Sequence, residues 1–293
     1  MYKGAALMNP AIFKGKSVIV QGITGTHGAF HAHNMVSYGT SIVAGTSPTK
    51  AGQAMDGIPV YATIADIQAD MHVDVSVIFV PAPHAKAAIL EAIDAEIPLI
   101  ITITENIPVH DMLMIRHRLD SSKSTLIGPN CPGVLVPDGN LLGIIPAHLA
   151  TPGTVGLVSR SGTLTYEAMD LLTQRGLGQK YIIGIGGDMI RGSGFIECLQ
   201  LFQDDPTITH IVMIGEIGGV DEIEAGNYIR QHITKPVYAY IAGHTAPPGV
   251  QMGHAGAILG SNSLESSDAK TAHLNNCGVT TAPSITELID RIK

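Results

Sequence analysis

Short apolar runs alternate with longer segments of helical periodicity along most of this chain of 293 residues. The alternation is typical of parallel sheets with helices on both faces, because parallel strands need a long crossover connection that is usually helical. A stretch rich in proline and glycine, 137–153, has no clear periodicity and is interpreted as a linker. We therefore predict an α/β protein with two domains, 1–145 and 146–293, close to the usual size of about 150 residues per domain.

The expected elements follow from these runs. Those of the first half are strands at 17–21, 41–44, 75–80, 99–104 and 126–128, with helices at 85–95 and 110–120. Those of the second half are strands at 155–159, 180–185, 211–215 and 237–242, with helices at 165–174, 194–202 and 221–232. Gly176 follows Arg175 and is expected to end the first of these last helices, since glycine is the usual residue just past a helix end.

Charged residues make up only 14% of the chain and hydrophobic residues 45%. Because so few charges leave much of a surface apolar, we expect another subunit to cover part of it. The net charge of -8 and the absence of a lysine or arginine run argue against nucleic-acid binding. Apolar stretches stay below the roughly 18 uninterrupted residues that a membrane span needs, so we expect no membrane insertion.

Three cysteines, Cys131, Cys198 and Cys277, are far apart and form no CxxC pair. They predict a reducing compartment, without a disulfide framework or structural zinc. The start of the chain lacks the apolar core of a signal peptide, which favours the cytoplasm, or the mitochondrial matrix if the source is eukaryotic. His27 and His31 lie one helical turn apart, as metal ligands can, but no carboxylate stands nearby, so we expect no metal site.

A glycine-rich segment, Gln21–Gly28, follows the first expected strand and opens a helix. Phosphates bind at such turns because backbone N–H groups and the helix dipole converge on them. The GxxGxxG spacing departs from the dinucleotide pattern, and the second strand ends in Gly45-Thr46, where an NAD site needs an acidic residue. An NAD-dependent oxidoreductase is therefore disfavoured.

The opening segment is locally basic. The first acidic residue is Asp56, so Lys3, Lys14, Lys16 and Lys50 precede any acidic side chain. A positive region of this kind suits a ligand with several phosphates, such as coenzyme A. Glycines that serve only the tight turn, and a solvated basic tail, are the alternatives.

In the second half, His254 stands among small residues in the run Met252–Ala257. Thirty-eight residues upstream, Glu216 directly follows the expected strand at 211–215. If Glu216 accepts a hydrogen bond from one ring nitrogen, the other nitrogen becomes an aimed and more basic nucleophile, as a phosphoryl acceptor requires. A histidine that merely occupies a turn is the alternative.

The run Ser161-Gly162-Thr163 opens the next expected helix, which carries Tyr166. Its N–H groups and the helix dipole could stabilise a phosphate on His254. An ordinary N-cap, with Ser161 or Thr163 starting the helix, is the alternative.

Five motifs occur in order at compatible spacings: Gln21–Gly25, Gly128–Gly133, Ser159–Glu167, Gly215–Gly219 and Gly253–Ala257. Together they resemble the alpha subunits of succinyl-CoA synthetase, in the NDP-forming acyl-CoA synthetase superfamily, from about Ile12 onward. The resemblance implies a Rossmann-type CoA-binding domain followed by a flavodoxin-like parallel-sheet ligase domain. It also implies a beta subunit with an ATP-grasp fold, in an αβ or α2β2 assembly. Such a subunit would supply the nucleotide site, since this sequence has no GxxxxGK[ST] loop.

In that family, ATP or GTP with Mg²⁺, bound mainly by the beta subunit, phosphorylates the histidine that matches His254. A carboxylic acid takes the phosphoryl group, and CoA displaces phosphate to give succinyl-CoA reversibly, as in the tricarboxylic acid cycle. By resemblance Glu216 orients the histidine, and phosphate or substrate is bound by Ser161, Gly162, Thr163 and Tyr166. The positions that match CoA contacts are Thr24, Gly25, Thr26, His27, Lys50, Ile103, Thr104 and Glu105.

Two departures from the family pattern leave the acid open. Ser261–Ser266 replaces a glycine-rich stretch with lysine, and Arg191 stands where neutral residues are common. A third departure, Pro48–Gly52 in place of Pro-Gly-Lys-Gly-Gly, restricts the backbone near the expected CoA site. Because an added guanidinium can bind another carboxylate, malate, citrate or another di- or tricarboxylate is the alternative substrate. A non-catalytic CoA-binding module is disfavoured, since His254, Glu216 and the 161–163 turn are all present.

Overall fold

The computed structural model describes residues 10–13, 17–247, 249–260 and 262–293. The chain divides into two compact units. The first comprises the residues up to Leu135, with Gly139–Ile145 and Ile190–Gly192, and the second comprises Val136–Asp138, Pro146–Met189 and Ser193–Lys293. The domain limits expected from the sequence, 1–145 and 146–293, stay a prediction. Lys3, Lys14, Lys16 and Ser261 lie outside the described residues.

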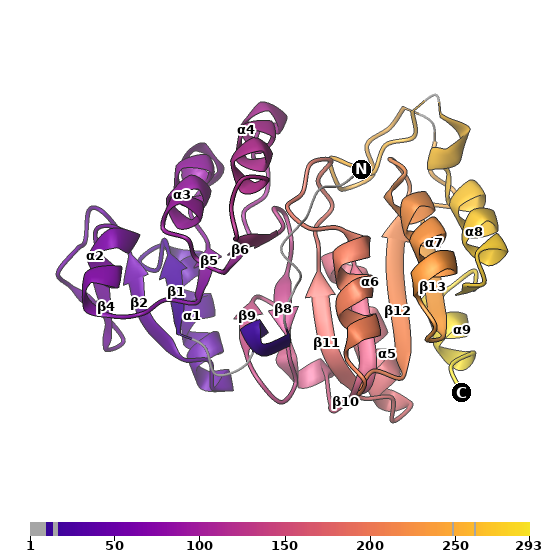
Figure 1. Ribbon diagram of the computed structural model, residues 1–293, viewed down its shortest axis with the longest axis horizontal. Helices are drawn as coiled ribbons and strands as arrows, with labels where there is room; N and C mark the ends of the chain where they lie inside the picture. Colours follow the sequence, from indigo (N-terminus) through magenta and orange to yellow (C-terminus); the bar gives the residue numbers. More distant parts are fainter. Residues whose placement is uncertain (1–9, 14–16, 248, 261) are drawn as a thin grey trace. The chain divides into compact units, whose positions relative to one another are not determined.

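The first unit is built on a sheet that is parallel except for its first, antiparallel pair. In spatial order its strands are β3 (Ala54–Met55), β4 (Ile58–Tyr61), β2 (Ile42–Thr46), β1 (Val18–Gln21), β5 (Val75–Ile78), β6 (Leu99–Thr102) and β7 (Thr125–Ile127). Its helices are α1 (Thr26–Tyr38), α2 (Ile64–Asp70), α3 (Ala82–Asp94) and α4 (Val109–Leu119), after the short 3₁₀ turn η1 (Pro10–Phe13). Helices α3 and α4 lie on one face of this sheet and α1 on the other (Figure 1).

The central strands of this sheet are buried along their whole length. Strands β1, β5 and β6 read Val-Ile-Val-Gln, Val-Ser-Val-Ile and Leu-Ile-Ile-Thr. Nearly continuous apolar runs are expected where helices cover both faces of a parallel sheet. The core between sheet and helices includes Ile19, Ile78, Ile89, Ile100 and Ile115.

The second unit repeats the design. Its strands are all parallel, in the order β14 (Thr280–Thr281), β13 (Val237–Ala242), β12 (His210–Glu216), β10 (Pro152–Ser159) and β11 (Gln179–Gly184). Its helices are α5 (Gly162–Gln174), α6 (Phe195–Asp204), α7 (Asp221–His232), α8 (Ser267–Asn276) and α9 (Ile285–Asp290), with the 3₁₀ turns η2 (Ala147–Leu149) and η3 (Ser263–Glu265). Helices α6 and α7 cover one face of the sheet and α5 the other (Figure 1).

The predicted α/β fold class, with one parallel-dominated sheet in each half, is confirmed. The helix end expected at Gly176 is also confirmed, because α5 ends at Gln174 and Gly176 has a positive φ of 71°. The interpretation of 137–153 as a linker is wrong in part. The segment contains β9 (Leu141–Gly143), which pairs with β8 (Gly133–Leu135), and β10 already begins at Pro152.

The sequence does not predict strand β9, because this strand is defined by contacts with distant residues and not by a periodic pattern of its own. The hydroxyl of Thr40 donates to the Leu141 carbonyl oxygen at 2.8 Å and accepts from the Leu141 N–H at 3.0 Å. The buried Asn140 amide donates to the Phe13 carbonyl oxygen at 3.0 Å. Short elements held by distant residues have no sequence pattern of their own.

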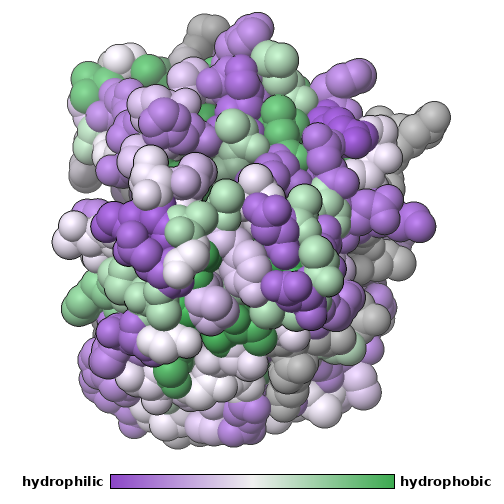
Figure 2. Space-filling view, turned by 90° about the vertical axis from the view of Figure 1, so that its left-hand side faces the viewer, coloured by the Kyte–Doolittle hydropathy of each residue, from purple (hydrophilic) through white to green (hydrophobic). Residues whose placement is uncertain are grey.

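In the part of the chain that the structure describes, none of the helices has the length and apolarity needed to cross a bilayer. Figure 2 shows the side that carries α2 and β4, where hydrophilic and hydrophobic side chains are interspersed. Elsewhere, on α4, Val109, Leu113 and Met114 expose large hydrophobic side chains. Coverage of part of the surface by another subunit stays a prediction.

Candidate active site

The second sheet brings His254 and Glu216 together at its carboxyl edge. Glu216 is the last residue of β12 and is only 5% exposed. Its Oε2 lies 2.7 Å from Nδ1 of His254, which comes from the glycine-flanked segment after β13. A Cβ at position 187 would overlap the imidazole, so only glycine lets this backbone lie against the ring. The pairing expected from the two motifs therefore exists as a direct contact.

The environment of His254 favours a proton on Nδ1. The hydrogen bond with Glu216 raises the pKa of His254 above its ordinary value, although burial opposes the shift. The Glu216 charge and Asp188 also raise this pKa, whereas Arg160 lowers it. With Nδ1–H donating to the carboxylate, the neutral imidazole keeps its lone pair on Nε2. The ring is therefore arranged to attack through Nε2.

A buried arginine lies behind Glu216. Arg160, which follows β10, is 2% exposed, and its Nε lies 3.2 Å from Oε1 of Glu216. The angle of this contact falls outside hydrogen-bond geometry, so the two groups interact as an ion pair. Burial alone would lower the pKa of Arg160, but Glu222 and Glu216 outweigh it and raise that pKa. Glu216 thus lies between a permanent cation and the imidazole.

The expected phosphate-binding turn opens α5. Ser161 is the N-cap, and its hydroxyl accepts a 3.4 Å hydrogen bond from the Leu164 N–H. Gly162 and Thr163 occupy the first turn, where backbone N–H groups have no acceptor inside the helix. Tyr166 lies one turn further and is half-buried. Ser161 is therefore the N-cap of this helix, and phosphate or substrate binding by Ser161, Gly162, Thr163 and Tyr166 stays a prediction.

The candidate CoA residues of the first unit gather at the carboxyl edge of its own sheet. Gly25 is the N-cap of α1 and Gly28 is buried in its first turn, where a Cβ would overlap the Gly22 carbonyl oxygen. Thr24 donates its hydroxyl to Ser47 at 2.8 Å. Gly25, Thr26, His27 and Lys50 are exposed at this edge.

Strand β6 ends at the same edge. Ile103 and Thr104 follow it and are half-buried, and the Thr104 hydroxyl donates to the Val80 carbonyl oxygen at 2.6 Å. Glu105 is exposed. Near Lys50, an open hollow of about 420 Å³ is lined by Ala51, Gly52, Gln53, Pro59, Val60, Tyr61, Ala62 and Asp66. Contact between these residues and CoA stays a prediction.

Two other features considered in the sequence are a metal site at His27 and His31 and the surroundings of Cys131. Within the described ranges, no group of three or more His, Cys, Asp or Glu side chains could hold a metal ion. The His31 ring instead stacks on Phe79, with centroids 5.5 Å apart. Cys131 is 4% exposed, and its Sγ donates to the Thr102 carbonyl oxygen at 3.3 Å.

Two family models match the chain, one for each half. Residues 13–106 match a CoA binding domain and residues 158–279 match a CoA-ligase domain. The chain is 48% identical to a succinate–CoA ligase [ADP-forming] subunit alpha of Staphylococcus aureus over 281 residues, 96% of this chain and 93% of the relative. A subunit of the same name from Staphylococcus epidermidis is 48% identical over 282 residues, again 96% of this chain and 93% of the relative.

The chain belongs to the succinate–CoA ligase alpha-subunit family. The resemblance stated from the five motifs, and with it the ligase class, is therefore confirmed. Family membership also identifies the first half as a CoA-binding domain and the second as a CoA-ligase domain.

Solved structures agree with this fold. ATP citrate lyase from Methanothrix soehngenii, in complex with citrate and coenzyme A, superimposes with a TM-score of 0.84 at 26% identity, over 95% of this chain. The match covers 50% of that protein, so the chain spans half its length. A dinucleotide-forming acetyl-coenzyme A synthetase from Ca. Korarchaeum cryptofilum, with a TM-score of 0.75 at 22% identity over 95% of this chain and 60% of that one, shares the fold.

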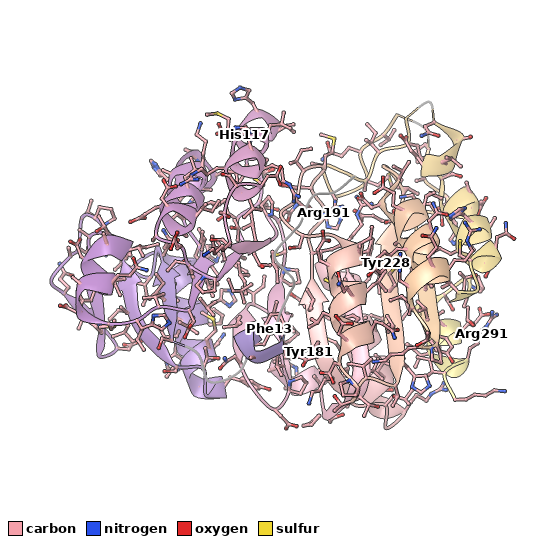
Figure 3. The ribbon with its side chains drawn as sticks, in the orientation of Figure 1. Phe13, His117, Tyr181, Arg191, Tyr228 and Arg291 are labelled. Carbon is pink, nitrogen blue, oxygen red and sulfur yellow. The ribbon has the colours of Figure 1, made fainter. Side chains whose placement is uncertain are left out.

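The structure describes the contacts of two of the departures from the family pattern, Arg191 and the loop around Ser261–Ser266. Arg191, labelled in Figure 3, lies between β11 and α6, and Arg116 donates to its carbonyl oxygen at 3.5 Å. In the altered loop, the Gly260 N–H donates to Glu265 at 2.7 Å, and Asn262 accepts from the Leu264 N–H at 3.0 Å. Carboxylate binding by Arg191 stays a prediction.

The sequence reading missed three charged residues of this ligase domain. Arg160 lies inside the Ser159–Glu167 motif, and that motif by itself predicts no role for its guanidinium. Glu222 and Lys270 are both 0% exposed, and no motif points to either of them. A lysine amid helical periodicity gives no sign of burial, because its burial depends on what packs against the helix.

Proposed function

We propose that this chain is the alpha subunit of a ligase that forms succinyl-CoA reversibly from succinate, CoA and ATP or GTP, through a phosphohistidine and an acyl phosphate. The observation that carries the proposal is the 2.7 Å contact between His254 Nδ1 and Glu216 Oε2. It prepares one ring nitrogen for nucleophilic attack, in a chain whose family relatives are named succinate–CoA ligases.

In the first step, Nε2 of His254 attacks the γ-phosphorus of the nucleoside triphosphate. An N–P bond forms, and the bond between the γ-phosphorus and the departing nucleoside diphosphate breaks. The ring then carries a substituent on one nitrogen and a proton on the other, and is positively charged. Glu216 stabilises that charge through the proton on Nδ1. N–H groups at the start of α5 are suited to hold the phosphoryl oxygens, because the helix dipole favours an anion there.

In the second step, a carboxylate oxygen of the acid attacks phosphorus, the N–P bond breaks, and His254 returns to its neutral form. CoA sulfur then attacks the acyl carbon and phosphate leaves, while the thiol proton passes to phosphate or water. Lys50 and the β1–α1 turn would hold the phosphates of CoA. We assign ATP or GTP and Mg²⁺ mainly to a beta subunit of ATP-grasp fold, in an αβ or α2β2 assembly. A cytoplasmic location accords with this reading and stays a prediction.

The test is product formation by the chain co-purified with its beta subunit. Succinate, malate and citrate are supplied separately with CoA, Mg²⁺ and either ATP or GTP, and acyl-CoA is measured by mass spectrometry. Succinyl-CoA as the fastest product supports the proposal. Faster formation of citryl- or malyl-CoA would instead favour the alternative substrates, to which the likeness to ATP citrate lyase with bound citrate lends weight. If a complex that binds CoA forms no acyl-CoA from any of the three acids, the chain would instead be a non-catalytic CoA-binding module.

A further inference from the structure

Behind the His254–Glu216 pair lies a buried cluster of charges that the reaction scheme does not use. Arg160 Nη1 lies 3.0 Å from Oε1 of Glu222 and donates to the Gly218 carbonyl oxygen at 3.1 Å. Lys270, from α8, pairs with the other oxygen of Glu222, on α7. These side chains are almost completely buried, at 2% exposure for Arg160 and 0% for Glu222 and Lys270. Burying charged groups costs desolvation free energy even when the charges are paired. The presence of this cluster therefore needs an explanation other than stability.

Each polar group of Glu216 contacts either a residue of this cluster or His254. Its backbone N–H donates to Oε1 of Glu222 at 3.1 Å, and its carbonyl oxygen accepts from Lys270 Nζ at 2.7 Å. Its side-chain Oε1 faces Arg160 and its Oε2 faces His254. Backbone and carboxylate are thus fixed together, which leaves a single orientation toward the imidazole.

The protonation states follow from the contacts. Lys270 Nζ has three acceptors, the carbonyl oxygens of Glu216 and Gly218, both at 2.7 Å, and a Glu222 oxygen. Three acceptors use all three protons of an ammonium group, and a neutral amine would supply only two. Burial lowers the pKa of Lys270, yet the geometry keeps it charged. Burial would raise the pKa of Glu222, but Arg160 and Lys270 lower it below its ordinary value.

Two cations therefore balance two carboxylates beside a histidine that must change charge. We propose that Arg160, Glu222 and Lys270 form a charge-balanced positioning network, which holds Glu216 on His254 and sets the pH range in which the imidazole is neutral. The nucleophilic use of that imidazole rests on the proposed function, whereas the titration of the ring does not. The charged groups that bear on His254 and its network are Glu216, Arg160, Asp188, Glu222, Lys270 and Asp221.

The network makes a prediction about sign. Glu222→Gln leaves one excess positive charge, which disfavours the imidazolium and lowers the titration midpoint of His254. Lys270→Gln leaves one excess negative charge and raises the midpoint. The double variant restores balance and returns the midpoint toward that of the wild type. Each single shift is expected to be on the order of half a pH unit or more, since the charges act across a buried region.

The measurement is an NMR titration of the full chain with ¹³C-labelled histidine rings, in which the His254 signal is identified by its loss in His254→Asn. Glu224→Gln is the matched control, because it removes a carboxylate from the same helix outside the network, and it should leave the midpoint in place. Opposite shifts in the two single variants, cancelled in the double variant, support the network. Shifts of the same sign, or none, in folded variants would overturn it.

Glu222→Gln keeps the shape of the side chain, so its downward shift alone decides the question if Lys270→Gln does not fold. Phosphate uptake from labelled ATP, by the same variants with the beta subunit, separates the two proposals. Normal wild-type uptake without opposed shifts would refute only the network. Opposed shifts in a chain that never takes phosphate on His254 would refute only the proposed function.

Discussion

The carboxyl edges of the two sheets share a plan, a glycine-bearing turn followed by a helix N-terminus, yet their surroundings differ. At the first edge, Thr26, His27 and Lys50 are exposed. At the second, Glu216 and Arg160 are at most 5% exposed. Exposed groups can hold an anion that arrives with its own charge, whereas a charge that develops during a reaction is stabilised best by groups already fixed and dry. The first edge therefore suits CoA binding and the second suits chemistry.

His254→Asn should separate the two edges most sharply. Asparagine cannot replace the nucleophilic nitrogen, so phosphate uptake and succinyl-CoA formation should fall by more than about a thousandfold. CoA affinity, measured by calorimetry, should stay unchanged, because the first edge does not depend on His254. Substantial phosphate uptake or succinyl-CoA formation by this variant would contradict the assignment of the chemistry to His254 at the second edge.

Glu216→Gln should reduce the rate of phosphate uptake by about 10² to 10³, since a neutral amide oxygen accepts the Nδ1 proton more weakly than a carboxylate and cannot balance the charge of the cationic ring. Rapid-quench measurement with labelled nucleotide gives this rate. Glu224→Gln, again on α7 but away from His254, serves as the control. A rate within a fewfold of wild type would show that Glu216 is only a structural neighbour.

Lys270→Met tests the buried charges of the second edge through stability. Removing one partner of a buried ion pair typically costs about 3–5 kcal/mol of unfolding free energy, and Glu222 would lose its α8 cation here. Denaturant unfolding should show this loss, whereas Lys123→Met, at an exposed lysine, should change stability by less than about 0.5 kcal/mol. Equal stability of the two variants would contradict the assigned role of the cluster.

The raised pKa of His254 predicts a pH dependence for the second edge. Phosphate uptake needs the neutral ring, so its rate should fall about tenfold per pH unit as the pH drops below a midpoint above the ordinary 6.5. The stabilising effect of the His254–Glu216 contact has the opposite trend, being complete below pH 6.5 and lost as the pH rises through the folded midpoint. CoA affinity should not follow the same curve. An uptake rate that is flat between pH 5 and pH 8 would count against a nucleophilic His254.

Lys50→Met should have the smallest effect. An exposed cation contributes less than about 1 kcal/mol to an ionic contact, so CoA affinity should weaken about two- to fivefold, and less at high salt. Phosphate uptake on His254 should not change. Weakening of both would mean that the two edges are not independent, and no weakening of CoA affinity would remove Lys50 from the CoA site.

The sequence predicted the parts of this molecule that depend on local pattern and on the rule that parallel strands end at a common edge. The pairing of Glu216 with His254 follows from a strand ending in a carboxylate and a later histidine between glycines. The role of Arg160, Glu222 and Lys270 could not be predicted in this way. Helix α8 reads Ser-Asp-Ala-Lys-Thr-Ala-His-Leu-Asn-Asn, a polar sequence, and its lysine is buried only because the helix packs against α7 and β13. Strand β9 was missed for the same reason, because Thr40 and Asn140 hold it through distant contacts.

The most direct test of a phosphorylated His254 is to locate the phosphate on the chain. The chain with its beta subunit is incubated with labelled ATP or GTP and Mg²⁺, and the phosphorylated residue is mapped by mass spectrometry, with ³¹P–¹H NMR to identify the ring nitrogen. We expect an acid-labile, base-stable phosphate on Nε2 of His254, discharged by succinate plus CoA. Phosphate on Nδ1, an acid-stable phosphate on a residue such as Ser161, or no phosphate at all in a CoA-binding complex would contradict this expectation.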